Sequence, residues 1–438
     1  MQTTLFTNVQ VLDGTGALPY AAEVLVEGNR ISHVARQAGT ISRSAHRVVD
    51  GGGATLMPGL VDAHLHLTWN NQPSLSAIQQ MPPEEHVLFA SEMAKLVLDH
   101  GFTSGFGAAA AKPRLDVVIR NAINSGRIPG PRYKAAGQEI ATHGGLGDTC
   151  PPHIEHEGLN FGYIVSGPEE VRRAVRLFIK YGVDNIKLNL SGEEIVGVGA
   201  NETPMSREEV AMACSEAKMR GKTLCAHARS AQSIKLCVDY GIEVIYHASY
   251  ADEEALDKLE AVKDRHFVAP ALAWLIGTAR YAEAYGIIPG TPLADQYEAE
   301  LEVACQNMKK MHQRGIRVLP GGDYGFAWIP HGTNARDLEY FVDLVGFTPM
   351  EAILSATKYG GQLMGMGEEL GQIQPGYLAD LLLVNGDPLG DVTILQDQAN
   401  LLAIMKDGTF HKEPAPALQD LAVAPPPAQP AYAEQAAP

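Results

Sequence analysis

The stretch Pro58-Gly59-Leu60-Val61-Asp62-Ala63-His64-Leu65-His66 joins an apolar strand to two histidines that are separated by one residue. Side chains at positions i and i+2 of a strand point to the same side, so both imidazoles can reach one metal ion. Imidazole is also the commonest metal ligand in proteins. The stretch therefore predicts a buried strand that carries two metal ligands at its carboxyl end.

Short apolar runs alternate with helix-length segments through the middle of the chain. Eight runs within about 310 residues indicate a parallel sheet, because its strands are buried on both faces. They predict a (β/α)8 TIM barrel over residues 57–369, with its active site at the carboxyl ends of the strands. A doubly wound open sheet is the alternative, but no GxGxxG marks a strand-to-helix turn. The expected barrel strands are Leu56–Ala63, Thr103–Ala108, Arg132–Ala136, Asn185–Leu190, Thr223–Ala226, Val244–Tyr246, His266–Ala271 and Arg317–Leu319.

Both ends of the chain have the texture of a small antiparallel sheet. Alternating runs such as Thr4–Val11 and Leu401–Lys406 are separated by turn signals, including Asp13-Gly14 and Asp407-Gly408. We expect residues 1–56 and 370–412 to complete one sandwich-like β-domain together. Residues 413–438 contain 16 Ala or Pro among 26 residues, so they predict an extended, mobile tail.

Composition restricts the partners and the location. Acidic residues number 51 and basic residues 34, for a net charge of −17, and a field of this sign repels phosphate backbones and anionic lipids. The five cysteines form no CxxC pair, which fits reduced thiols. No signal peptide or run of about 18 apolar residues is evident. We expect a cytoplasmic homo-oligomer that acts on a small molecule and binds neither nucleic acid nor a membrane.

Further ionisable residues lie at the carboxyl ends of the other predicted strands. His227 and His247 end two of them, and Asp323 closes the last. Each alone fits a satisfied strand-end residue, but together with the first histidine pair they predict a metal-binding site. Lys187 lies inside an apolar strand, where an ammonium is costly unless it is paired, deprotonated or chemically converted.

The motif Pro58–His66 and the order of these ligands resemble the amidohydrolase superfamily over roughly residues 1–412. The resemblance implies that His64, His66, His227 and His247 bind two divalent ions, expected to be zinc, with manganese, cobalt or iron as alternatives. It also implies that Lys187 takes up carbon dioxide and bridges the binuclear metal centre as a carbamylated lysine. Asp323 would bind the hydrolytic water and act as the base.

Two loop segments, Ala141-Thr142-His143-Gly144-Gly145 and His331-Gly332-Thr333-Asn334-Ala335, look most like one branch of this superfamily. That branch includes imidazolonepropionase-like proteins, prolidase-type peptidases, ochratoxinase, phenylurea hydrolases and molinate hydrolase. Where many peptidase-like members are rich in glycine after the lysine strand, this chain has Leu188-Asn189-Leu190-Ser191-Gly192-Glu193-Glu194. This departure favours the enzymes that cleave ureas and carbamates.

The expected function is hydrolysis of an amide, urea or carbamate C–N bond by a metal-activated hydroxide. Asp323 would move the proton to the leaving nitrogen, and His143 would polarise the scissile carbonyl. Hydrolysis of an N-acyl amino acid or dipeptide is the main alternative. A ring deaminase usually lacks the bridging lysine, and a non-catalytic scaffold has no reason to retain the ligand set.

Aromatic residues follow several predicted strands closely. Trp69, Trp274 and Trp328 occupy loops that form the rim of a barrel site. They predict an aromatic or bulky apolar group beside the scissile bond. We also expect Arg229 and His331 to contact the substrate, and an arginine here would bind a carboxylate and favour N-acyl amino acids.

Overall fold

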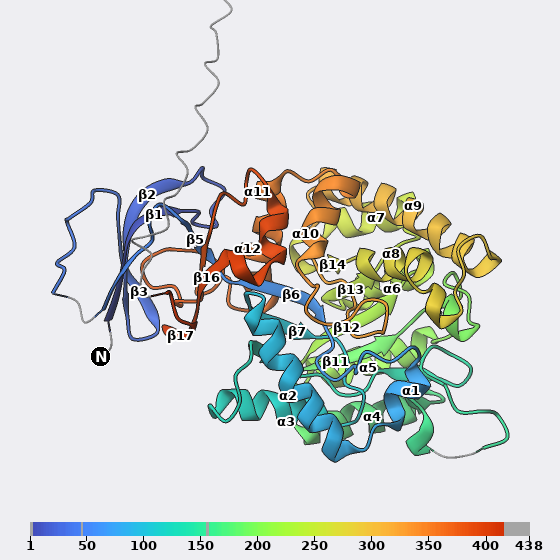
Figure 1. Ribbon diagram of the computed structural model, residues 1–438. Helices are drawn as coiled ribbons and strands as arrows, with labels where there is room; N and C mark the ends of the chain where they lie inside the picture. Colours follow the sequence, from blue (N-terminus) through green and yellow to red (C-terminus); the bar gives the residue numbers. More distant parts are fainter. Residues whose placement is uncertain (1–2, 45–46, 155–156, 416–438) are drawn as a thin grey trace, which may run out of the picture.

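The computed structural model describes residues 3–44, 47–154 and 157–415. A helix-covered barrel lies beside a smaller sheet built from both ends of the chain (Figure 1). The barrel strands are β6 (Leu60–Leu65), β7 (Phe102–Gly107), β8 (Arg132–Lys134), β11 (Asn185–Asn189), β12 (Thr223–Ala228), β13 (Val244–His247) and β14 (Phe267–Ala269). Two short strands, β9 (Ile140–Thr142) and β10 (Tyr163–Val165), follow β8 in the chain and extend the sheet at β11, with which β9 pairs.

Parallel pairing and backbone hydrogen bonds close the barrel. β6 to β8 are parallel neighbours, as are β11 to β14, and a backbone hydrogen bond joins the residues after β8 to the start of β11. The eighth predicted strand, Arg317–Leu319, is reduced to a parallel bridge between Val268 and Val318. Ala63 N donates to Pro320 O at 3.0 Å and joins this segment to β6. The predicted (β/α)8 barrel is confirmed.

The outer helices form because their apolar residues recur on one face. In α4 the buried residues Val171, Ala174, Val175 and Phe178 have the spacing i, i+3, i+4 and i+7. The helix ends at Gly182, whose φ of +96° suits glycine. The helices are α1 (Leu75–Gln80), α2 (Pro83–Asp99), α3 (Leu115–Asn124), α4 (Pro168–Tyr181), α5 (Arg207–Lys218), α6 (Ala231–Tyr240), α7 (Glu253–Ala261), α8 (Leu272–Arg280), α9 (Pro292–Gln313), α10 (Arg336–Tyr340), α11 (Pro349–Ala356) and α12 (Lys358–Leu363).

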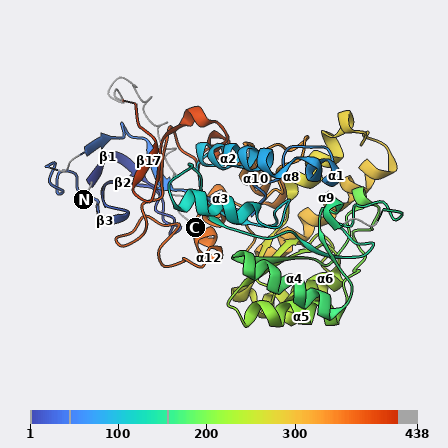
Figure 2. The same ribbon diagram turned by 90° about the horizontal axis from the view of Figure 1, so that it is seen from below.

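The smaller sheet combines strands from the two ends of the chain in the order β17-β16-β15-β5-β1-β2-β3, with β4 paired to β1. It lies to one side of the barrel in both views (Figures 1 and 2). The exact limits of the predicted domains remain predictions. The strands are β1 (Thr3–Val11), β2 (Tyr20–Glu27), β3 (Arg30–Ala35), β4 (Arg47–Asp50), β5 (Thr55–Pro58), β15 (Leu381–Val384), β16 (Leu401–Lys406) and β17 (Thr409–Lys412).

The predicted strand Leu56–Ala63 is divided at Gly59, which corrects the expectation of one continuous strand. β5 before the division belongs to the smaller sheet, whereas β6 after it belongs to the barrel. Gly59 N donates to Asp380 O at 2.9 Å, and a Cβ at Gly59 would lie 2.2 Å from the Thr103 hydroxyl. No side chain fits at this crossing, although the apolar pattern continues through it.

Three apolar cores stabilise this arrangement. The largest lies between the barrel and its helices, one fills the interior of the barrel around Phe106, Cys225 and Tyr246, and one belongs to the smaller sheet. A barrel filled in this way is a packed core with its site at one end. The cluster described below lies at the carboxyl ends of the strands.

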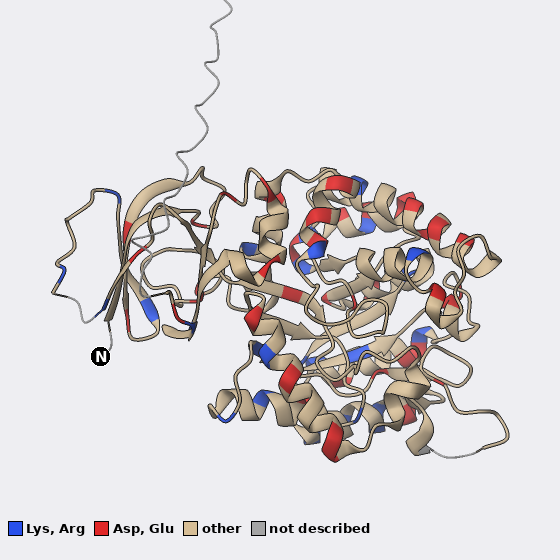
Figure 3. Cartoon of the chain, viewed as in Figure 1, with Lys and Arg blue, Asp and Glu red and all other residues tan. Residues whose placement is uncertain are grey.

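Charged side chains of both signs are distributed over the helices around the barrel (Figure 3). In the described part of the chain, no helix is long and apolar enough to cross a membrane. The predicted tail, residues 413–438, lies outside the described residues from position 416 onward.

Candidate metal centre

Four buried histidines meet at the carboxyl ends of three barrel strands. His64 lies in β6 and His66 directly follows it, while His227 lies in β12 and His247 ends β13. The ring centroid of His64 lies 5.0 Å from that of His66 and 5.4 Å from that of His247. The ring centroids of His227 and His247 lie 4.3 Å apart. The histidines that the sequence singled out are therefore brought together.

Asp323 completes the cluster from the segment after the eighth strand. Its Oδ1 lies 3.1 Å from His66 Nε2 and 3.6 Å from His64 Nε2. One ligand atom each of His64, His247 and Asp323 lies within 4.8 Å of the others. His247 and Asp323 have φ of +71° and +64°, a region that non-glycine residues occupy at a cost and that recurs at active sites.

Several polar atoms in this cluster are buried without a hydrogen-bond partner. They are His66 Nε2, both ring nitrogens of His247, Nδ1 of His64 and Oδ1 of Asp323. Buried polar atoms are normally satisfied, so converging exceptions require an explanation. Nitrogen and oxygen atoms of this kind are the ligands of zinc and related divalent metals. The cluster therefore fits a metal site.

Burial sets the protonation of the ligands. It lowers the pKa of His64, His227 and His247 well below the ordinary value, so these imidazoles are neutral and able to bind metal. Burial alone would raise the pKa of Asp323, but its close contacts with His64 and His66 and the charge of Lys187 hold it below its usual range. Neutral imidazoles beside a carboxylate are the form that a divalent cation binds.

Neighbouring groups orient the histidine rings. His66 Nδ1 lies 2.9 Å from Ala109 O, and His227 Nε2 lies 2.9 Å from Gly192 O. Because each nitrogen must donate to its carbonyl, the opposite ring nitrogen is left as the metal-binding atom. Such contacts to the second ring nitrogen are typical of metal-ligating histidines.

Aspartates that the sequence analysis did not select hold the backbone of the ligand segments. His64 N donates to Asp62 Oδ1 at 2.8 Å, and Asn334 Nδ2 donates to Asp62 Oδ2 at 2.7 Å. Gly321, two residues before Asp323, donates from its backbone N to Asp337 Oδ2 at 2.8 Å. Asp62 lies in the histidine motif itself, but nothing in the sequence marks Asp337.

Lys187 projects from β11 into the same cavity and is almost fully buried. Its Nζ lies 5.0 Å from the ring centroid of Tyr246. Among the residues that the structure describes, its charge acts on the carboxylates of Glu139 and Asp323, and no ion pair of this ammonium is found. Its burial without an ion pair matches the sequence-based expectation that this lysine is costly unless converted.

A cavity opens from the cluster. Trp69 and Trp274 line it, as the sequence predicted, whereas Trp328 does not and instead donates from Nε1 to Thr278 Oγ1 at 3.0 Å. The other lining residues are His64, Leu75, Glu139, Leu146, Lys187, Glu193, Ile195, His227, His247, Asp323 and Phe326. The wall thus combines six aromatic or aliphatic residues with seven ionisable ones, including carboxylates beside the metal ligands.

Three further predicted residues lie outside this lining. His143 is exposed, and its Nδ1 lies 2.8 Å from Ser166 Oγ, so nothing in its position supports a role at the scissile carbonyl. His331 is buried, and its Nε2 lies 2.9 Å from Trp69 O, so it contacts the backbone of the tryptophan. Arg229 is fully buried in an ion-pair cluster.

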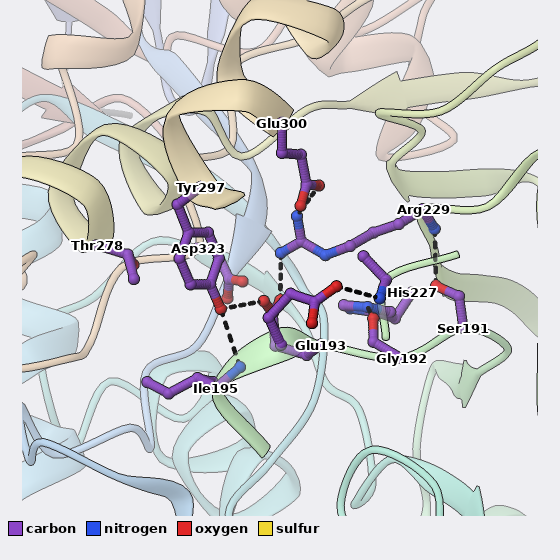
Figure 4. Close-up of polar contacts among 12 residues, drawn as sticks. Ser191, Gly192, Glu193, Ile195, His227, Arg229, Thr278, Tyr297, Glu300 and Asp323 are labelled. Atoms are coloured by element: carbon purple, nitrogen blue, oxygen red, sulfur yellow. Dashed lines mark hydrogen bonds and ion pairs between the residues drawn. The ribbon is translucent and has the colours of Figure 1, made fainter. Parts of the chain in front are cut away.

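The Arg229 cluster adjoins the cavity (Figure 4). One end of the guanidinium pairs with Glu300 from α9 and the other with Glu193, which lines the cavity. Burial alone would lower the pKa of Arg229, but the two carboxylates raise it above the ordinary value. As placed, the arginine is committed to these partners, so its predicted contact with a substrate carboxylate has no support.

Glu139 and Glu193 are cavity residues that sequence reasoning missed as site residues. Glu193 lies in the segment after the lysine strand, where many peptidase-like members are rich in glycine and this chain is not. That departure was the sequence feature that could have indicated Glu193. Glu139 precedes the loop that holds His143 and shows no comparable signal. Burial raises the pKa of Glu139.

Comparisons with known proteins agree with this geometry. A family model described as the amidohydrolase family matches residues 55–410. Ochratoxinase of Aspergillus niger is 28% identical over 401 residues, which span 85% of this chain and 78% of that protein. A solved Xaa-Pro dipeptidase with bound methionine has a TM-score of 0.82 at 27% identity, covering 94% of this chain and 100% of the other. A prolidase complexed with N-methylphosphonate-L-proline has a TM-score of 0.85 at 25% identity, with the same coverage.

Proposed function

The chain belongs to the amidohydrolase family and is a hydrolase that acts on C–N bonds, and on this premise we propose that it cleaves an amide, urea or carbamate bond of a small aromatic molecule. The observation that carries the proposal is the convergence of unpartnered, buried ligand atoms on one cavity. A catalytic metal needs such a donor set beside a space for substrate.

We infer a binuclear zinc centre as the resident cofactor. His64, His66, His227 and His247 would hold the two ions, and Lys187, carbamylated by carbon dioxide, would join them. The burial of Lys187 beside the histidines supports this assignment, since a carbamate is anionic and suits a position between two cations. Divalent ions bound here would supply Lewis acidity and lower the pKa of a water towards neutrality.

Asp323 is the residue that we assign to proton transfer. Its Oδ1 is buried without a hydrogen-bond partner and lies beside the histidines. A carboxylate in this position accepts a proton from the attacking water and returns it to the leaving nitrogen. The return matters because an amine anion is a poor leaving group until it is protonated.

Hydrolysis of N-acyl amino acids or dipeptides is the second candidate. The similarity of the chain to ochratoxinase and to a Xaa-Pro dipeptidase favours this candidate. Both candidates use the same centre and differ in the charge of the substrate. A ring deaminase is less compatible with Lys187, and a scaffold does not account for the intact ligand set.

Metal analysis of the purified protein tests the proposal. We expect about two equivalents of a divalent transition metal per chain, because the donor atoms suffice for two ions. A screen of the metal-loaded protein on phenylureas, aryl carbamates, anilides, N-acyl amino acids and dipeptides should show C–N cleavage that a chelator abolishes. Active protein without any transition metal would refute the mechanism.

The aromatic lining predicts a preference among substrates. The Trp69 ring lies 5.0 Å from that of Phe326, which lies 4.5 Å from that of Trp274, so the three form one apolar wall. Aryl substrates should exceed their methyl analogues in kcat/KM by at least roughly tenfold, the scale of one filled apolar pocket. The measurement is kcat/KM across a matched series, and equal values throughout would contradict the prediction.

A further inference from the structure

The charges that line the cavity are unevenly distributed. Glu139, Glu193 and Asp323 are carboxylates, and Lys187 is the one lysine or arginine among the lining residues that the structure describes. Lys187 lies among the metal ligands and is committed to the centre under the function proposed above. A substrate carboxylate would therefore find no free cationic side chain on this wall.

Arg229, the nearest candidate for such a contact, is already saturated. Its side chain has no exposed surface, and its two terminal nitrogens pair with Glu193 and Glu300. Figure 4 shows the guanidinium held between the two glutamates. Releasing it would leave buried carboxylates unpaired, which is costly.

Glu193 is held firmly on the cavity wall by its other contacts. The Tyr297 hydroxyl donates to Glu193 Oε1 at 2.5 Å, while Ile195 N donates to the same hydroxyl oxygen at 3.1 Å. Both Arg229 and Tyr297 donate hydrogen bonds to this glutamate, which favours its carboxylate form. Burial raises the pKa of Glu193 to about 7 and Arg229 opposes that rise, so the charge of this glutamate depends on its ion pair with Arg229.

Glu139 provides an independent sign of the preferred ligand. It lines the same cavity, is almost fully buried, and leaves Oε1 without a hydrogen-bond partner. An acceptor in this state is satisfied by a donor such as the N–H group of a urea, carbamate or anilide. An N-acyl amino acid carries such an N–H group as well, so Glu139 favours N–H-bearing substrates, and discrimination against a carboxylate falls to Glu193.

We propose that Glu193, held by Arg229 and Tyr297, makes the site select uncharged N–H-bearing substrates and reject those that carry a carboxylate. Like charges in a poorly hydrated cavity repel strongly, and specificity often depends on such an unfavourable contact. The inference rests on the function proposed above and decides between its two candidates. It favours aryl ureas, carbamates and anilides over N-acyl amino acids.

Substrate pairs that differ only in one carboxylate test the proposal on the metal-loaded, full-length protein. One pair is N-benzoylphenethylamine and N-benzoylphenylalanine, and another is an aryl dimethylurea with a para carboxamide or a para carboxylate. We expect kcat/KM to be at least roughly tenfold higher for the uncharged member of each pair. Equal or faster cleavage of the carboxylates would overturn the proposal, whereas cleavage of neither member would contradict the proposed function itself.

Glu193→Gln identifies the residue responsible. It keeps the shape and removes the charge, so the ratio within each pair should fall at least roughly fivefold towards equality. Glu194→Gln is the matched control, because Glu194 is the adjacent residue, does not line the cavity, and accepts a hydrogen bond from Ala200 N at 3.0 Å. An unchanged ratio in folded Glu193→Gln would overturn the role of Glu193. If that variant does not fold, the wild-type ratios decide the proposal.

Discussion

Lys187→Ala is expected to be nearly inactive and to lose part of its metal. The substitution removes the residue of β11 that lines the cavity together with His64, His227 and His247. Without an anionic bridge, two cations would repel each other in a buried site. The check is kcat together with elemental analysis, repeated in the presence of a short carboxylic acid, which we expect to restore part of the activity.

Two further variants make this result specific. Lys235→Ala removes a lysine that pairs with Asp252 and Glu254 at the surface of α6 and should leave kcat and metal content unchanged. Lys187→Arg keeps a positive charge but cannot form a carbamate. Full activity of that variant would exclude a carbamate bridge.

Asp323→Asn is expected to lower kcat by roughly 10²–10⁴, the usual contribution of general acid–base catalysis. Asparagine has nearly the same shape but cannot accept the proton from water. Metal content should fall much less than kcat, because four histidine ligands remain. A variant that lost its metal and regained full turnover when metal was added would show that Asp323 is only a ligand.

The sequence predicted the barrel and the metal cluster well because both depend on local patterns. Apolar runs mark buried strands, and a residue at the carboxyl end of such a strand can lie only at one end of the barrel. His64, His227 and Asp323 are placed together by this rule alone. The division of 56–63 at Gly59 was missed because an apolar pattern does not show which of two sheets a strand joins.

The cavity wall was predicted less well because it depends on contacts between distant elements. Arg229 follows a predicted ligand and seemed free in the sequence, yet its partners come from a loop after β11 and from α9. Trp328 was also predicted to line the site, but it lies outside the lining and its Nε1 donates a hydrogen bond to Thr278. Side-chain direction in a loop is set by partners that no local pattern reveals.

The smaller sheet has a consequence for the order in which the molecule folds. β5 lies between β1 and β15, with Met57 opposite Leu382. β1 is synthesised at the start of the chain, whereas β15 is synthesised near its end. During synthesis from the amino terminus, β5 must wait for nearly the whole barrel to emerge before its second edge is covered. An uncovered edge can pair with another chain. The growing polypeptide is therefore exposed to aggregation at this strand until translation is almost complete, and a truncation before Leu381 would make that exposure permanent.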